Sequence, residues 1–116
     1  MHEVSLVRSI FRTLEEEFPA EKMNRLLKVN VKVGLLSNVE PLLMQNAFQA
    51  LIEAEEKYRH VALETETVPV AIYCADCEHT SEVQHYKFVC AVCGKLNNNV
   101  TQGTELLIHQ VHFSEN

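Results

Sequence analysis

The chain has 116 residues, the size of one ordinary domain, and its 47% hydrophobic and 22% charged content is typical of a folded globular protein. Sixteen acidic against ten basic side chains give a net charge of −6, which argues against a surface that neutralises nucleic-acid phosphates or anionic lipids. The longest apolar run, residues 68–74, is too short to span a membrane, and the opening residues lack the basic and apolar regions of a signal peptide. We therefore expect a cytoplasmic protein, in which disulfides are rare.

The first half of the chain alternates between helical and extended patterns. Residues 4–18 carry apolar side chains at helical spacing and predict an amphipathic helix that Pro19 ends. Residues 27–33 alternate strictly between apolar and polar side chains, which predicts a half-buried strand ended by Gly34. A second helix begins near residues 37–41, either with Ser37 and Glu40 as a capping box or with Pro41 as its first residue.

The second helix and the elements after it complete the predicted order. Its expected apolar face consists of Leu43, Ala47, Phe48, Leu51 and Ile52. Its solvated end is residues 53–59, and a second strand follows at 61–68. After a cysteine-bearing insert and an asparagine loop at 97–99, residues 104–113 predict a last strand. The simplest packing is an α+β fold, in which residues 1–69 and 100–116 form one domain and residues 70–99 a second, inserted one.

Four cysteines form two pairs with the same internal spacing: Cys74, Cys77, Cys90 and Cys93. Two thiolates separated by two residues can bind one ion from a tight turn, and two such turns supply the tetrahedral sulfur set of a structural zinc site. Gly94, directly after the second pair, suits a turn that requires positive φ. The spacing favours zinc; rubredoxin-like iron, structural disulfides and a redox pair are the alternatives. The insert has few apolar residues, so metal binding would supply much of its folding free energy.

The opening residues Met1, His2 and Glu3 offer a second metal-binding chemistry. The terminal amine, deprotonated backbone amides and the His2 imidazole can close five- and six-membered chelate rings in one plane. Such a planar nitrogen set suits Ni(II) or Cu(II) rather than tetrahedral zinc. By itself this signal is weak, because a histidine at position 2 is a bystander in most proteins.

These features together resemble one family. A chain that opens MHE, carries VGLLSNVEP at residues 33–41, two CxxC pairs, and TQGTELLIHQV at residues 101–111 is similar to the HypA/HybF nickel metallochaperones of [NiFe] hydrogenase maturation. The resemblance extends over essentially the whole chain. It implies a small mixed three-stranded sheet with two helices and an inserted four-cysteine zinc ribbon, in a protein that is not an enzyme.

The resemblance also implies roles for individual residues. His2 would be a nickel ligand and Glu3 the residue that shapes the nickel site, so that residues 1–69 with the last strand form a nickel-binding domain. The four cysteines would hold structural Zn(II) in the ribbon at residues 70–99, with Ni(II) as transferred cargo. Glu40 would lie near the nickel site, where it either contributes to the site or caps a helix. Some relatives carry histidine directly after the second CxxC, where this chain has Gly94.

The implied partners are the nickel-handling GTPase HypB and the precursor of the [NiFe] hydrogenase large subunit. No nucleic-acid or membrane partner is expected, and the chain would be a monomer or a homodimer. A zinc-ribbon module for nucleic-acid binding or protein interaction is the alternative. It predicts a basic ribbon, whereas this one carries Lys87 and Lys95 against three acidic residues, Asp76, Glu78 and Glu82.

Overall fold

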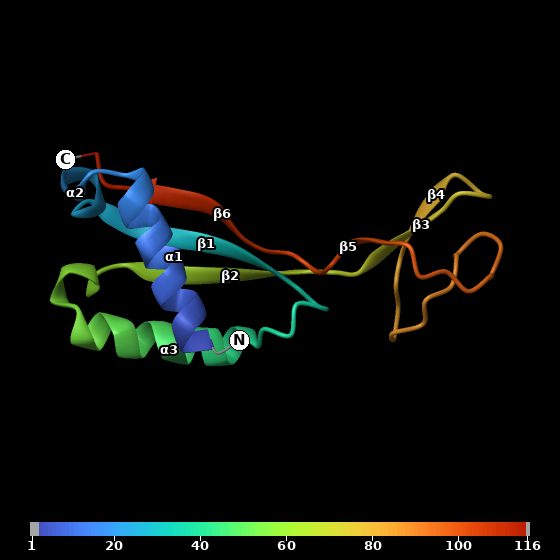
Figure 1. The fold of residues 1–116 in the computed structure, drawn as a ribbon, viewed down its shortest axis with the longest axis horizontal. Helices are drawn as coiled ribbons and strands as arrows, with labels where there is room; N and C mark the ends of the chain where they lie inside the picture. The colour runs from blue at the N-terminus through green and yellow to red at the C-terminus, as the bar shows by residue number, and fades with distance from the viewer. Residues whose placement is uncertain (1–2, 116) are drawn as a thin grey trace.

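The computed structural model describes residues 3–115, which form an elongated body of 54 × 26 × 18 Å (Figure 1). A helix-covered sheet occupies one end and a second, smaller sheet the other. The elements are α1 (Glu3–Glu17), α2 (Ala20–Met23), β1 (Leu26–Gly34), α3 (Pro41–Ala54), the 3-10 turn η1 (Glu56–Tyr58), β2 (Ala62–Val68), β3 (Ala71–Cys74), β4 (His79–Glu82), β5 (Val100–Gln102) and β6 (Leu106–Phe113). Over this part of the chain, no helix has the length and apolarity that a membrane crossing requires.

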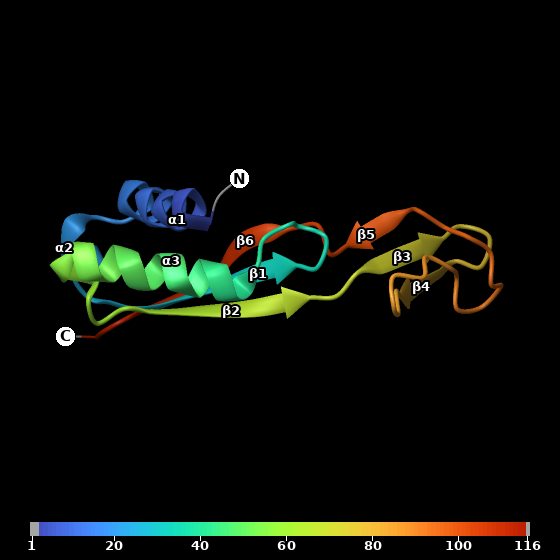
Figure 2. The same cartoon turned by 90° about the horizontal axis from the view of Figure 1, so that it is seen from below.

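The first sheet confirms the predicted fold class. Its strand order is β2-β1-β6, with β1 parallel to β2 and antiparallel to β6, so the sheet is mixed. The helices α1 and α3 lie on the same face of this sheet (Figure 2). The apolar stripe of α1 is buried there as predicted, and Phe11 stacks on Phe48 of α3 with ring centroids 5.7 Å apart. Burial of these stripes supplies the main stabilisation of the domain.

The start of α3 decides between the two predicted caps. Pro41 is the first helical residue, and Glu40 is the N-cap, with its carboxylate accepting a hydrogen bond from the Leu42 N–H at 3.4 Å. The predicted apolar face of α3 is wrong at one position, because Leu43 is 50% exposed and Met44 is fully buried in its place. The helix places Met44 one turn before Phe48, so these two side chains point into the core together.

The stretch expected to be the solvated end of α3 contains a buried side chain. The helix ends at Ala54, and Tyr58 in η1 is only 4% exposed. Its hydroxyl donates a hydrogen bond to the carboxylate of Glu15, and its ring lies 4.7 Å from that of Phe11. Burial and the neighbouring carboxylate raise the pKa of Tyr58, while the hydrogen bond lowers the pKa of Glu15. This pair therefore joins η1 to α1.

The second sheet has the order β4-β3-β5 and is antiparallel throughout. It corrects the predicted end of the chain. Residues 100–102, for which the sequence pattern predicted no strand, form β5 and pair with β3, and β6 starts at Leu106 rather than at residue 104. The asparagine stretch is also more ordered than a plain loop, since Asn97 donates through its amide to the Tyr73 carbonyl at 2.8 Å.

The two sheets meet where three backbone segments pass close to one another. Gly34 ends β1, and its N–H donates to the Glu105 carbonyl at 2.7 Å; two residues later, the Leu36 N–H donates to the Gly103 carbonyl at 2.7 Å. A methyl group on Gly34 would overlap that same Gly103 carbonyl. Gly103 has φ of +110° and lies against Val70. Both glycines are therefore required for the junction, the first by space and the second also by backbone conformation.

We expect Gly34→Ala to destabilise the protein by about 1–3 kcal/mol, because the added Cβ meets backbone that cannot move without breaking the junction's hydrogen bonds. The measurement is the urea midpoint of unfolding followed by circular dichroism. Leu35→Ala is the matched control, because this neighbouring side chain is 49% exposed and should change the midpoint little. Equal midpoints for Gly34→Ala and wild type would show that the junction is looser than described.

Candidate functional site

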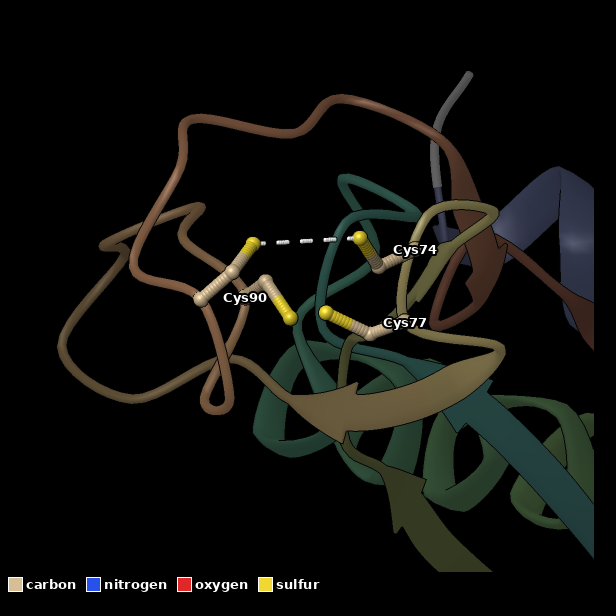
Figure 3. A group of neighbouring side chains, drawn as sticks. Cys74, Cys77 and Cys90 are labelled. Carbon is tan, nitrogen blue, oxygen red and sulfur yellow. Dashed lines mark hydrogen bonds between the residues drawn. The ribbon is translucent and has the colours of Figure 1, made fainter.

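The four cysteines converge at the far end of the second sheet. Cys74 ends β3, Cys77 lies in the turn between β3 and β4, and Cys90 and Cys93 lie in a turn after β4. All four sulfur atoms lie within 4.8 Å of one another, and the Sγ atoms of Cys74 and Cys93 are 4.0 Å apart. Figure 3 shows Cys74, Cys77 and Cys90 directing their sulfurs towards a common centre. The structure thus brings together side chains that are up to 19 residues apart in sequence.

Each pair of cysteines occupies a tight turn that reverses the chain in the same way. The residue after each second cysteine has positive φ: +49° at Glu78 and +75° at Gly94. In the second turn the Gly94 N–H donates to the Cys90 carbonyl at 2.9 Å, and the Val92 N–H points to the Cys90 sulfur at 3.4 Å. The sequence analysis predicted positive φ only in the second turn, where Gly94 is present. In the first turn a glutamate adopts the left-handed region, which a sequence pattern based on glycine does not detect.

Backbone N–H groups lower the pKa of one cysteine thiol, whereas burial raises the pKa of another. Hydrogen bonds from the backbone of Cys93 and Val92 lower the pKa of Cys90 to about 6. Burial and the neighbouring cysteines raise the pKa of Cys77 to about 12. Four thiolates this close repel one another, so a bound cation is required for all four to be ionised together.

The donor set fits a tetrahedral zinc ion. With Zn–S bonds of about 2.3 Å, the sulfurs of a regular tetrahedron are about 3.8 Å apart. The 4.0 Å separation of Cys74 and Cys93, and the 4.8 Å limit for every pair, lie close to that value. Four sulfur donors complete the coordination shell and leave no open position for a substrate, which is the arrangement of a structural site.

Several polar residues that sequence patterns did not single out hold the cysteine turns in place. Ser81 is buried, and its hydroxyl accepts a hydrogen bond from the Ala91 N–H at 3.0 Å, which ties β4 to the second cysteine turn. Asn97 and Asn99 both donate through their amides to the carbonyl of Tyr73, directly before Cys74. The tripeptide of asparagines was the available signal, because such residues bond to backbone groups in irregular segments.

His79 lies near the cysteines but outside their cluster. It pairs with Cys74 across the β3–β4 ladder and is exposed. Among residues 3–115, the cluster whose ligand atoms lie within metal-binding distance of one another contains the four cysteines and no histidine. The structure therefore gives His79 no position among the ligands.

The N-terminal motif is described only in part. His2, the expected nickel ligand, lies outside the described residues. Glu3 begins α1, and one of its carboxylate oxygens accepts a hydrogen bond from the Glu40 N–H at 3.4 Å. Because Glu40 caps α3, this contact brings the first residues of both helices together, with two carboxylates at the meeting point. The helix N-termini favour negative charge there.

Comparison with known proteins gives one consistent result. The family model for hydrogenase/urease nickel incorporation, the metallochaperone HypA, matches residues 1–113. Hydrogenase maturation factors HypA from Desulfitobacterium hafniense and Shewanella sp. (strain MR-7) are 33% and 30% identical; each alignment covers 99% of this chain and at least 97% of the relative.

Two solved structures are similar to this chain over nearly their whole length. The solution structure of the Ni metallochaperone HypA from Helicobacter pylori is 26% identical, with a TM-score of 0.65 and 97% of both chains covered. A second solution structure of a HypA protein gives a TM-score of 0.71 at 26% identity, covering 100% of this chain and 98% of the other. The family match over residues 1–113, the curated relatives and the shared fold agree with the sequence resemblance, and the chain belongs to the HypA family of nickel metallochaperones for hydrogenase maturation.

Proposed function

We propose that this chain binds Ni(II) at its N-terminus through His2 and Glu3, carries it as cargo, and delivers it with the GTPase HypB to the [NiFe] hydrogenase large-subunit precursor. In this proposal the four cysteines hold structural Zn(II), and the chain has no catalytic activity of its own. The observation that carries the proposal is the family match, which includes the opening residues and both cysteine pairs.

The contact between Glu3 and Glu40 supports a nickel site at this end of the molecule. The Glu40 N–H donates a hydrogen bond to one carboxylate oxygen of Glu3, and a carboxylate has a second oxygen that could bind a metal. The imidazole of His2 and the deprotonated backbone amides would supply nitrogen donors in a plane, which is a geometry that Ni(II) accepts. An exposed ligand set at a chain end can be replaced donor by donor, which suits transfer rather than storage.

A structural zinc ion is supported by the closed, all-sulfur donor set. Zinc bound by Cys74, Cys77, Cys90 and Cys93 would cross-link the turn after β3 to the later turn and would supply folding free energy to a segment with few buried apolar residues. We propose on this basis that residues 1–69 and the last strand form the nickel-binding domain, while residues 70–99 form the zinc-binding domain.

The ribbon offers little support for the alternative of nucleic-acid binding. Of its two lysines, Lys95 lies 3.9 Å from the carboxylate of Asp76. Net charge over the whole chain is −6, and phosphate binding depends on unneutralised cations. We therefore retain the metallochaperone proposal.

The proposal predicts nickel transfer. Nickel-loaded protein, incubated with the GTPase, GTP and the hydrogenase large-subunit precursor, should leave nickel in the re-isolated precursor, measured by inductively coupled plasma mass spectrometry. The control supplies the same amount of nickel as the free ion in the presence of a chelator. Because docked partners can replace the nickel ligands one by one, the precursor should gain nickel from the protein and little from the control. Equal nickel in both reactions would contradict a carrier role.

A further inference from the structure

A groove of about 440 Å³ is lined by residues of α1, α3 and the η1 segment, and the two helices cover the same face of the first sheet (Figure 2). On the α3 side its wall is built mainly from small side chains at helical spacing, Ala47, Ala50 and Ala54. On the α1 side it is lined by Val4, Arg8 and Arg12, which are spaced four residues apart along the helix. The alanines leave the groove hollow, and its rim carries both the arginines and two acidic residues, Glu15 and Glu55.

The two arginines are chemically available. Arg8 and Arg12 are exposed, and within residues 3–115 neither side chain donates a hydrogen bond or forms an ion pair within 4.0 Å, although Arg12 is near enough to Glu15 to help lower the pKa of that carboxyl. The remaining cation of the groove, Lys57, is already engaged, 3.2 Å from a carboxylate oxygen of Glu15 and 4.0 Å from one of Glu55. Lys57 thus offsets Glu15 and Glu55, and the two guanidinium groups leave the rim of the groove with more cations than carboxylates in a protein of net charge −6.

The shape and charge of the groove define what it can hold. Two guanidinium groups one helical turn apart match two carboxylates one turn apart on a facing helix, and the planar guanidinium suits bidentate pairing with a carboxylate. The apolar floor requires that the same helix carry small or aliphatic side chains on the face between them. A lone phosphate or small anion would satisfy the arginines but leave the floor uncovered.

We propose that the α1–α3 groove is the docking site for an acidic amphipathic helix of a partner protein, with its carboxylates on Arg8 and Arg12 and its apolar face on the alanine wall. Helix-in-groove recognition of this kind depends on apolar anchors for affinity and on charge pairs for orientation. A second hollow of about 330 Å³ shares Val4, Ala47 and Ala50 with the groove and extends to Glu3. A docked helix would therefore lie beside the N-terminal motif; only this connection to nickel delivery rests on the proposed function.

The test uses a synthetic peptide of about 16 residues, long enough to form an amphipathic helix, with glutamates four residues apart and alanine and leucine on its other face. A matched peptide has lysine in place of glutamate. Binding to the full-length protein is measured by fluorescence anisotropy. Arg8→Gln with Arg12→Gln should weaken binding of the acidic peptide about tenfold, because two partly exposed charge pairs are lost. Lys32→Gln with Lys87→Gln is the control: it removes the same charge outside the groove and should leave binding unchanged.

A second variant separates shape from charge. Ala50→Gln places a longer uncharged side chain in the hollow at an exposed helical position, so it should weaken the acidic peptide several-fold without unfolding the protein. The lysine peptide should not bind. Equal binding of the acidic peptide to wild type and the arginine variant, or equal binding of both peptides, would overturn the proposal. So would a wild-type dimer in sedimentation that the arginine variant dissociates, because the occupant would then be a second copy.

Nickel binding provides the independent readout. The groove variants leave His2 and Glu3 in place, so their nickel stoichiometry should equal that of wild type. Loss of peptide binding with nickel retained supports the groove, whatever the result of the transfer experiment. Retained peptide binding in the arginine variant overturns the groove and leaves the nickel proposal unaffected.

Discussion

Replacing His2 with alanine is expected to reduce nickel binding from about one equivalent per chain to a level undetectable against a competing chelator, because the planar donor set loses its imidazole and one chelate ring. Zinc content should not change, because the metal-binding cluster among residues 3–115 consists of the four cysteines alone. Residue 2 precedes Val7, the first buried side chain of α1, so the free energy of unfolding should change by less than about 0.5 kcal/mol. The measurement is nickel and zinc per chain after dialysis against the chelator.

A control variant and the pH dependence of nickel binding test whether the effect is specific to His2. His79→Ala removes an exposed histidine outside the proposed site and should keep both metals at the wild-type level. Nickel uptake should release protons from the imidazole and backbone amides, so nickel affinity should rise with pH. Undiminished nickel binding by the His2 variant would place the site elsewhere, among His79, His85 and the cysteines, and the proposed carrier mechanism would be wrong.

Cys90→Ser is expected to lower zinc from about one equivalent per chain to near zero and to unfold the ribbon, because the sulfur with backbone N–H support is removed from a four-donor site. Most of the first sheet should remain, since its core contains its own buried stripes from α1, α3 and β1. Zinc counting and backbone amide exchange of both sheets measure these effects. Because protons compete for thiolates, zinc should also leave the wild-type protein as the pH falls.

A matched change in the same turn tests whether the effect belongs to the sulfur. Val92→Ser alters an exposed side chain between Cys90 and Cys93 and keeps all four donors, so zinc should be retained. Zinc retained at the wild-type level by Cys90→Ser would exclude the assignment of all four cysteines as ligands. Iron in place of zinc, or four oxidised cysteines without metal, would reject the proposed zinc ion.

Sequence patterns predicted most elements of the first sheet and its helices. In each of these elements the apolar residues recur with one period, that of a helix or that of a strand, over a long enough segment to be recognised. The apolar face of α3 was harder to assign, since Leu42, Leu43 and Met44 are consecutive apolar residues and only packing decides which one is buried. Tyr58 stands among charged residues, and its burial depends on Phe11 and Glu15 of a distant helix. Such tertiary contacts have no local signal.

The cysteine cluster was predictable from spacing, whereas β5 and the groove were not. Strand β5 has three residues, and its pairing with β3 depends on a partner about thirty residues earlier in the chain. The groove forms only when α1 and α3 pack on each other, which brings Arg8 and Ala50 to one surface. The spacing of arginines along one helix was visible in the sequence, but the alanine wall opposite them was not.

The path of the chain between β2 and β6 has an entropic consequence for the first sheet. Residues 69–105 separate these two strands, and the insert's ends are held together where β3 pairs with β5 and where the Gln102 amide donates to the Pro69 carbonyl at 3.0 Å. A folded insert therefore closes like a short loop, whereas an unfolded one must be closed over its full length. Loop-closure entropy sets this difference at about 1–2 kcal/mol, so a metal bound to the cysteines would stabilise the pairing of β6 with β1 without contacting either strand.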